Sequence, residues 1–412
     1  MNRLVAQGAL AERTQIKPSI LMMFGVILLS YAVNAMDRMV FPLLASDIRQ
    51  AHGFSVAGTG LIATIFTLGM ALAGWPTGIL LSRYSRKTVL QIGALIFSAG
   101  TVSIALAHGF LDMLVYRTAT GVGEVMQQMA IATIATTYFV RARALAVSIT
   151  QVAFGLGNFS GPLLAAAAVS LYGGWQGAFF VFGAAGFAMM ALIAIFVRPH
   201  FTEVKAEITS SLRIVGGADR LWNRNTVVLS IIALLTGLIL YGYLGLYSTF
   251  LREHLRFAPK EVAVIMCMFG LGGLLAPIGG WLGDRLPQRN LLAMGYIGLS
   301  IFGYLLFNQV HTVAAHCVLS LCWGFTHSGV VYVNLWGAQI KAVKASLNAR
   351  ATGLFITCLY TTSAFGGYLM GFLVTKASWG MAAILQLSSL AALCAVLCLF
   401  IRSELMSRPQ HD

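Results

Sequence analysis

Long apolar runs, separated by short charged or Gly/Pro-containing segments, dominate this chain. We divide the runs into twelve segments of roughly 20–27 residues, and each is long enough to cross about 30 Å of hydrocarbon as a helix. The predicted spans lie near 19–45, 56–82, 88–108, 111–138, 144–170, 175–197, 226–251, 260–284, 290–308, 312–338, 350–375 and 379–401. Each is predicted to be an α-helix, because backbone groups in lipid must be satisfied internally and no alternating barrel pattern is present.

Composition supports the same class of protein. Of 412 residues, 58% are hydrophobic and 10% are charged, against about 25% charged in a soluble domain. We therefore predict an all-α polytopic membrane protein. The first 18 or so residues lack the features of a cleaved secretory signal, so the first span is expected to act as an uncleaved signal anchor.

The distribution of Lys and Arg predicts the orientation. With twelve spans both termini face one side, which collects most of the cations. The opposite side has only Arg49, Arg252, Arg256, Lys260 and Lys376. This asymmetry predicts that both termini are cytoplasmic, and we expect a bacterial inner membrane. The net charge of +14 then reflects topology and lipid headgroups, and it requires no nucleic-acid partner.

Two similar short segments, here called the cassettes, indicate an internal duplication. Each follows an even-numbered span, and matching residues are displaced by 202 positions. Gly78, Leu80, Arg83 and Lys87 recur as Gly280, Leu282, Arg285 and Arg289, while Arg86 and Asp284 lie within the first and second cassette respectively. The glycine is expected to let each helix end approach a neighbour, and the cations to face helix C-termini. We predict two six-span bundles, 1–199 and 226–412, joined by a cytoplasmic linker at 200–225.

With these cassettes, the chain resembles a major facilitator superfamily transporter over its whole length. The resemblance implies two pseudo-symmetric six-helix bundles around a midplane cavity, working by alternating access. The first cassette departs from the family pattern, because Ser82 replaces the usual acidic residue whereas Asp284 is present in the second. A weaker ionic latch is therefore expected in the first half.

Four charged residues lie inside predicted spans of the first half: Asp37, Arg38, Arg117 and Glu124. A charge at membrane depth costs at least about 2.5–3.5 kcal/mol, so such residues usually pair or line a water-filled cavity. Arg117, Gly121 and Glu124 share one helix face. Asp37 and Arg117 lie at similar depths, which predicts an ion pair. Arg38 points about 100° away from Asp37 and is assigned to the cavity.

The two acids are candidates for proton coupling. Burial favours a protonated carboxyl group and a nearby arginine favours the ionised form, so a carboxyl group between these environments can exchange a proton when the cavity changes sides. We assign this role first to Glu124 and second to Asp37. The simpler interpretation is a static charge network, but buried ion pairs contribute little to stability alone.

The Asp-Arg pair in the first span and the pattern Arg-x-x-x-Gly-x-Gly-Glu in the fourth are similar to the anion:cation symporter branch of the superfamily, which includes bacterial sugar-acid transporters and sialin relatives. The resemblance implies that Asp37 and Glu124 handle protons, Arg117 pairs with an acid, and Arg38 meets the substrate carboxylate. Guanidinium is suited to carboxylates. Proton symport would offset the electrical cost of anion entry.

Other polar residues in the spans are candidates for the pocket wall, although each alone is equally explained by packing. The predicted substrate-binding residues besides Arg38 are Tyr31, Asn34, Gln151, Asn158, Tyr241, His327, Asn334 and Tyr360. Among them His327 is a mid-span residue that can change its charge near neutral pH.

We expect proton-coupled symport of a small organic anion by a monomer. Two alternatives remain open: proton-coupled efflux of amphipathic compounds, favoured by Gly157, Gly161 and Pro162, and a membrane receptor or scaffold without transport. No enzymatic, nucleotide-binding or metal motif is present, and Gly121-Val-Gly123 lies inside a span. The six cysteines lack metal-binding spacing. No cofactor is expected beyond the proton gradient.

Overall fold

The computed structural model describes residues 18–139, 143–203, 214–344 and 347–409, and all structural statements concern these residues. The predicted N-terminal segment 1–17 and linker residues 204–213 lie outside the described part.

The first half of the chain is helical nearly throughout. Its helices are α2 (Pro18–His52), α3 (Val56–Thr64), α4 (Phe66–Arg83), α5 (Arg86–Ala105), α6 (Phe110–Tyr138), α7 (Arg143–Tyr172), α8 (Trp175–Phe196) and the short α9 (Pro199–Thr202). Helices α3 and α4 follow one another to make a single rod, so α2 to α8 supply six long rods. We call this set the N bundle.

The second half repeats this plan with several π-helical turns. Its helices are α10 (Arg224–Thr249), η2 (Phe250–His254), α11 (Pro259–Leu274), α12 (Ala276–Arg285), α13 (Gln288–Asn308), α14 (Val313–Gly324), η3 (Phe325–Tyr332), α15 (Val333–Lys341), α16 (Asn348–Lys376), α17 (Trp379–Ala383), η5 (Ile384–Ser388), α18 (Ser389–Cys398) and η6 (Ser403–Leu405). Successive pieces form the rods α10–η2, α11–α12, α14–η3–α15 and α17–η5–α18. We call this set the C bundle.

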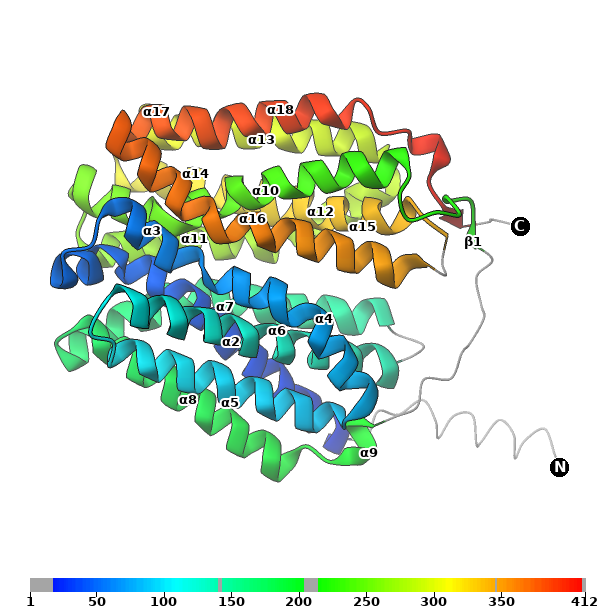
Figure 1. Ribbon diagram of the computed structural model, residues 1–412, viewed down its shortest axis with the longest axis horizontal. Helices are drawn as coiled ribbons and strands as arrows, with labels where there is room; N and C mark the ends of the chain where they lie inside the picture. Colours follow the sequence, from blue (N-terminus) through cyan, green and yellow to red (C-terminus); the bar gives the residue numbers. More distant parts are fainter. Residues whose placement is uncertain (1–17, 140–142, 204–213, 345–346, 410–412) are drawn as a thin grey trace.

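Figure 1 shows the two bundles side by side, with both chain ends on one side of the molecule. We call this side the termini side. Nine described helices are long and apolar enough to cross a membrane. Together with α6, the α14–η3–α15 rod and α16, which run beside them, they make two sets of six. The predicted all-α fold of two pseudo-symmetric bundles is confirmed.

The ends of the rods are set by local signals in the sequence. Ser55 and Ser85 are N-caps, whose Oγ atoms accept hydrogen bonds from the backbone N–H groups of Gly58 and Thr88, each at 3.0 Å. Such caps satisfy the free N–H groups at a helix start. Gly53 has a φ of 68°, a left-handed conformation that suits glycine. The second rod therefore begins immediately after a tight turn.

A small sheet lies near the termini side. Strands β1 (Ile214–Val215) and β2 (Arg408–Pro409) pair antiparallel. The segment after β1 is held to the end of the α15 rod, because the N–H of Ala218 donates to the carbonyl of Ala342 at 3.2 Å. Residues 214–225 of the predicted linker are thus attached to the C bundle, whereas residues 200–203 contact the N bundle through Arg86.

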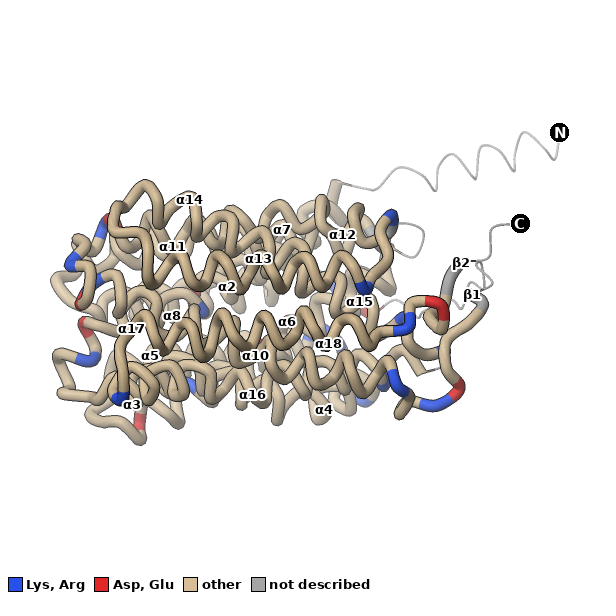
Figure 2. The backbone as a smooth tube through the Cα atoms, turned by 90° about the horizontal axis from the view of Figure 1, so that it is seen from above, with Lys and Arg blue, Asp and Glu red and all other residues tan. Residues whose placement is uncertain are grey.

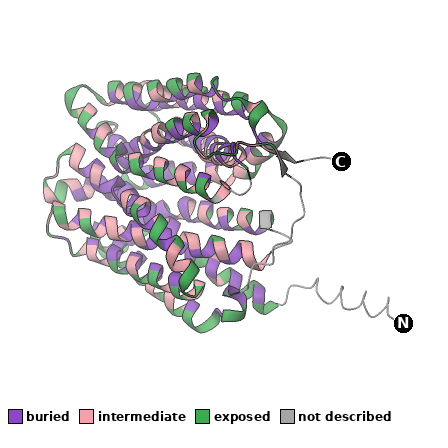
Figure 3. Ribbon diagram, turned by 45° about the vertical axis from the view of Figure 1, so that its right-hand side comes forward, coloured by how far each residue is buried: buried purple, intermediate pink, exposed green. Residues whose placement is uncertain are grey.

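Charged residues gather at the two ends of the rods, and the middle of the molecule is nearly free of them (Figure 2). The ribbon is coloured as buried mainly where helices face one another inside the molecule, and as exposed mainly on the outer helix faces and at the rod ends (Figure 3). The outward faces are themselves apolar in places: Leu72, Trp75 and Leu171 are exposed. A broad exposed apolar surface fits a lipid surrounding.

Close packing joins the bundles through glycine. A Cβ on Gly60 would collide with the carbonyl oxygen of Gly367, and one on Gly270 with the backbone of Phe159. The α3–α16 and α7–α11 crossings therefore need these small residues. Thr64 adds a hydrogen bond from its Oγ1 to the carbonyl of Ala364, at 2.8 Å.

Two ion pairs connect the bundles on the side opposite to the termini. Arg49 of α2 lies 2.5 Å from Glu253 of η2, and Arg252 lies 3.1 Å from Asp47. Ser46 donates a further hydrogen bond to Glu253 at 2.7 Å. We call these contacts the opposite-side ion pairs. They hold the first rods of the two bundles together on that side.

The first cassette contacts its own bundle. Lys87 donates to the carbonyls of Val197 and Ala194, at 2.7 and 3.0 Å, at the C-terminal end of α8. Arg86 donates to the hydroxyl of Thr137 at 2.8 Å and also to the carbonyl of Thr202. A cation near helix C-terminal carbonyls is favourable.

The second cassette makes different contacts. The guanidinium of Arg285 lies over the ring of Trp281 at 4.1 Å, and Arg289 donates to Asn290 at 3.4 Å. The side chain of Asp284 lies outside the described part. The expected close approach at the cassette glycines is wrong: a Cβ on Gly78 would meet no atom within 4 Å, and one on Gly280 only Val333 at 3.9 Å. Gly280 lines the cavity described below, whereas Gly78 is exposed.

We predict that Glu253→Gln weakens closure on the side opposite to the termini. Removing this partly buried charge costs about 1 kcal/mol, or about fivefold in the equilibrium. The rate at which a membrane-impermeant thiol reagent labels Ser248→Cys, a buried position on α10, should rise accordingly.

The control is Lys260→Gln, which removes an exposed charge on the same side and should leave the labelling rate unchanged. An equal rate with and without Glu253→Gln would contradict the proposed closing role of these ion pairs.

Candidate functional site

A cavity of about 620 Å³ lies between the two bundles. Its walls come from α2, α3–α4, α6 and α7 on one side and from α10, α11–α12, η3–α15 and α16 on the other. Ser148 near the start of α7, Trp281 near the end of α12 and Ile340 near the end of α15 belong to the lining. The cavity therefore extends toward the termini side, while the opposite-side ion pairs close the other.

Most of the predicted substrate-binding residues line this cavity. They are Tyr31, Arg38, Gln151, Asn158, Tyr241, His327 and Tyr360. They come from helices of both bundles that are far apart in the sequence, so the tertiary fold brings them around one space.

Asn34 and Asn334 do not belong to the cavity lining, contrary to our expectation. Asn34 donates to Gln127 at 2.6 Å, and Gln127 donates to Ser30 at 2.5 Å, inside the N bundle. Asn334 donates to the carbonyls of Gly279 and Val330, at 3.0 and 2.8 Å. Both amides hold neighbouring helices together, and we leave them out of the binding site.

Arg38 lies at the edge of the cavity and pairs with Glu124. Its Nε atom lies 2.8 Å from Glu124 Oε2, and both side chains are buried, at 5% and 0% exposure. Its Nη2 atom donates to Gln128 at 3.4 Å, and its guanidinium lies over the ring of Phe154 at 5.1 Å. We call Arg38 and Glu124 the cavity pair. The sequence pattern places Arg38 toward the substrate and indicates no partner for Glu124, so it does not predict this contact.

Asp37 and Arg117 form a second pair that is fully buried in the N bundle. Arg117 Nη1 lies 3.9 Å from Asp37 Oδ2, and Thr101 donates to Asp37 at 3.0 Å. The guanidinium of Arg117 lies over the rings of Phe66 and Phe41, at 4.7 and 5.3 Å. Neither member lines the cavity. We call them the buried pair.

The two pairs are placed at different distances from the cavity. Arg38 belongs to the lining, whereas Glu124 lies behind it. An anionic group in the cavity would thus meet Arg38 first and would compete with Glu124 for its guanidinium. The buried pair lies behind the lining residues Phe66 and Ala63: the Arg117 guanidinium contacts the ring of Phe66 and donates to the carbonyl of Ala63 at 3.4 Å.

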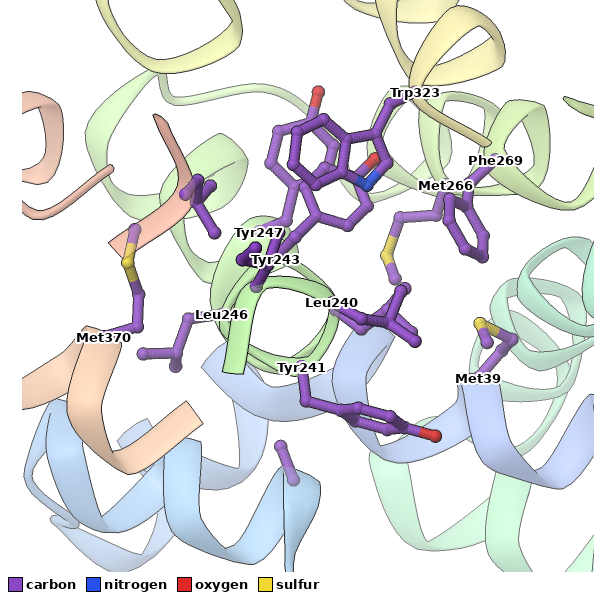
Figure 4. Packing of buried hydrophobic residues seen from close by; sticks show 14 of the residues in the cluster. Met39, Leu240, Tyr241, Tyr243, Leu246, Tyr247, Met266, Phe269, Trp323 and Met370 are labelled. Carbon is purple, nitrogen blue, oxygen red and sulfur yellow. The ribbon is translucent and has the colours of Figure 1, made fainter. Parts of the chain in front are cut away.

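Tyrosine side chains from both bundles line the same cavity as Arg38. They are Tyr31 of α2, Tyr241 of α10 and Tyr360 of α16. Figure 4 shows that Tyr241 leaves α10 on the side opposite to Tyr243 and Tyr247, which pack inside the C bundle. Both bundles therefore contribute tyrosines to the cavity wall.

The sequence did not identify several lining residues. Gln128 follows Glu124 by four residues and so lies on the same helix face, a spacing that could have identified it. Phe154 follows Gln151 by three residues on α7. For Trp281 and Trp336, no feature of the sequence separates an aromatic residue of the pocket from one that packs between helices.

The glycine near the charges serves helix packing. A Cβ on Gly121 would collide with the carbonyl oxygen of Phe66, so α4 occupies the notch predicted on α6. In the same way a Cβ on Gly157 would collide with Ala32 of α2, and one on Gly161 would touch Met36. The small residues that suggested efflux are therefore explained by the contact of α7 with α2.

Two six-helix bundles around a cavity that extends toward one side are the architecture of a secondary transporter. The comparison with protein families agrees: the model of the Major Facilitator Superfamily matches residues 27–366, and again 229–411. The chain belongs to this superfamily. It is a membrane transporter and not an enzyme.

Its relatives transport small organic anions. A probable sulfoacetate transporter of Cupriavidus necator is 26% identical, over 89% of this chain and 93% of that protein. A 4-hydroxybenzoate transporter of Acinetobacter baylyi is 21% identical, with 90% and 88% covered. A hexuronate transporter of Bacillus subtilis is 23% identical, with 95% and 96% covered.

A solved structure shows the same fold. A bacterial homolog to the human lysosomal transporter Spinster has a TM-score of 0.72 at 18% identity, covering 95% of this chain and 98% of that chain. At this identity the likeness shows the fold alone.

We predict that Arg117→Gln lowers the melting temperature of the purified protein by several degrees, because it leaves Asp37 buried without a cation. Breaking a buried ion pair on one side costs on the order of 3 kcal/mol. The double variant Arg117→Gln/Asp37→Asn should recover part of this loss, because the uncompensated charge is gone.

Fluorimetric thermal unfolding measures both variants, with Arg83→Gln on the exposed cassette as the control. A double variant that is no more stable than Arg117→Gln would show that the two residues are not energetically coupled.

Proposed function

We propose that this protein carries a small organic anion across the membrane together with protons, by alternating access. The observation that supports this most is the cavity pair: a permanently charged guanidinium at the edge of the cavity, held by a buried carboxylate 2.8 Å away. Guanidinium offers a planar fork of donors for a carboxylate or sulfonate. The relatives, which transport organic acids, are consistent with it.

The cavity pair offers a direct route for coupling. When the anion binds Arg38, it replaces Glu124 as the partner of the guanidinium. A buried carboxylate without its partner is costly, so Glu124 binds a proton at this stage. When the anion leaves, the guanidinium returns to Glu124 and the proton is released. Glu124 is thus the proposed proton carrier, and Arg38 the proposed substrate contact.

The buried pair has a supporting part in this proposal. Asp37 and Arg117 keep α2 and α6 at a fixed rotation, so that Arg38 and Glu124 meet at the cavity edge. Because Asp37 and Arg38 are adjacent in the chain, a change in the contacts of Arg38 also changes the electrostatic environment of the Asp37 carboxyl group. We retain Asp37 as a second proton site on this ground.

The direction of opening follows from the contacts between bundles. The cavity extends toward the termini side, and the opposite-side ion pairs close the other. With the termini in the cytoplasm, as the Lys and Arg asymmetry predicts, this conformation faces inward. Alternating access then requires the opposite-side ion pairs to break while the termini sides of the bundles come together.

Proton coupling also offsets the electrical cost of moving an anion into the cell. Moving one negative charge inward against a negative-inside potential costs about 2.3 kcal/mol per 100 mV. One proton cancels this charge, and any further proton makes the potential a driving force. No observation at the site favours either alternative, drug efflux or a receptor without transport.

We expect Glu124→Gln to abolish uptake of 4-hydroxybenzoate, sulfoacetate or glucuronate driven by an imposed proton gradient in proteoliposomes. The neutral amide cannot gain or lose the coupled proton. Exchange of labelled for unlabelled solute at equal pH should persist, since it needs no net proton movement. Glu404→Gln, the same substitution at an exposed position outside the cavity, serves as the control.

Equal loss of uptake, exchange and solute binding in Glu124→Gln would indicate a structural role. Retention of gradient-driven uptake would exclude Glu124 as the proton carrier.

For Arg38→Lys we expect a loss of affinity for the transported anion of about tenfold or more. Lysine keeps the charge but cannot hold Glu124 and the anion through one planar fork, and charge-assisted hydrogen bonds are worth about 1.5–3 kcal/mol. Isothermal titration of the purified protein measures this, with Arg83→Lys as the control. Unchanged affinity would remove Arg38 from the binding site.

A further inference from the structure

The two walls of the cavity differ in chemistry. Apart from tyrosine hydroxyls, the N-bundle wall supplies most of the polar groups, including Arg38, Gln128, Gln151 and Asn158. The C-bundle wall is largely aromatic and apolar, and its rings come from four separate rods. A solute in this space would have a polar side facing one bundle and an apolar side facing the other.

The aromatic part of the C-bundle wall is preorganised by its own packing. The ring centroids of Tyr332 and Trp336 lie 6.1 Å apart, and both rings contact the buried Phe355, at 5.8 and 6.2 Å. The rings of Trp336 and Phe355 are nearly parallel, with an angle of 6°. Tyr360 and Arg38 line the same cavity. A supported aromatic surface thus forms part of the cavity wall opposite the N bundle.

Two nitrogen atoms on this wall have no hydrogen-bond partner among the described residues: Trp336 Nε1 and His327 Nε2. Both residues line the cavity, and His327 is only 2% exposed. Buried polar atoms without partners are rare. The indole N–H can only donate, so it suits an acceptor oxygen of a solute.

From these observations we propose that the solute is a flat aromatic or conjugated carboxylate, with its carboxylate at Arg38 and its ring against Tyr332 and Trp336, and not a polyhydroxylated sugar acid. This deepens the proposed anion transport and rests on it. Offset stacking on aromatic rings favours a flat unsaturated solute. A sugar acid carries a hydroxyl on nearly every carbon, and those facing the C bundle would find few partners there.

A binding panel on the purified full-length protein tests the proposal. The probes are benzoate, 4-hydroxybenzoate, glucuronate and the uncharged benzyl alcohol, and isothermal titration measures their affinities. We expect both benzoates to bind at least about tenfold more tightly than glucuronate. The 4-hydroxyl group should add affinity through the free donors on the C-bundle wall.

A variant then tests the wall itself. Trp336→Leu should lower benzoate affinity about tenfold while leaving the weaker glucuronate affinity unchanged, and Trp336→Phe should restore binding of benzoate but not the gain from its 4-hydroxyl group. The control is Trp75→Leu on the outer surface, where the side chain is 79% exposed; its benzoate affinity should equal that of the parent.

The outcomes separate this inference from the proposed function. Glucuronate binding as tightly as benzoate, or Trp336→Leu weakening both alike, would overturn the aromatic specificity and leave anion transport standing. Benzyl alcohol binding as tightly as benzoate, or no carboxylate binding at all, would overturn the anion site itself.

Discussion

The ion pair between Arg38 and Glu124 is the contact on which the functional architecture depends. A permanent charge within the membrane requires a partner, and here the partner is a carboxylate that lies behind the guanidinium as seen from the cavity. Glu124 neutralises the Arg38 guanidinium when the cavity holds no anion. The guanidinium still borders the cavity, so an anion there could reach it. A pair placed deeper, as Asp37 and Arg117 are, could stabilise the bundle but could not sense a solute.

The two bundles have different roles because their buried side chains differ. The N bundle holds four mid-membrane charges, and the C bundle offers a packed aromatic surface with tyrosine hydroxyls. Their contact is made by small residues, such as Gly60 against Gly367, and by the opposite-side ion pairs. The rings of Phe66 and Tyr241 also meet across this interface, with centroids 5.8 Å apart. Rigid-body alternation between two bundles requires such contacts to break and to form again.

Glycine packing also fixes the electrostatics. Because Gly121 admits the carbonyl of Phe66, α6 lies directly against α4, and Arg117 is brought under the ring of Phe66. Gly157 and Gly161 similarly seat α7 on α2 and bring Phe154 over Arg38. Rotations of the helices that carry charge are therefore set by residues that carry none. In the first cassette Gly78 has open space on its Cβ side, whereas Gly283 in the second cassette packs against Asn334.

The sequence by itself determined the twelve helices, the duplication and the presence of costly charges in one half, because span length, hydropathy and repeat spacing are local properties. It also restricted Asp37 and Arg117 to similar depths. It could not determine which face of each helix meets the cavity. From one residue to the next along a helix, the depth of the side chain changes by only about 1.5 Å but its direction changes by about 100°. Packing between segments that are distant in the sequence sets these directions. It places Arg38 beside Glu124, keeps Asn34 and Asn334 out of the cavity lining, and brings Trp336 into it.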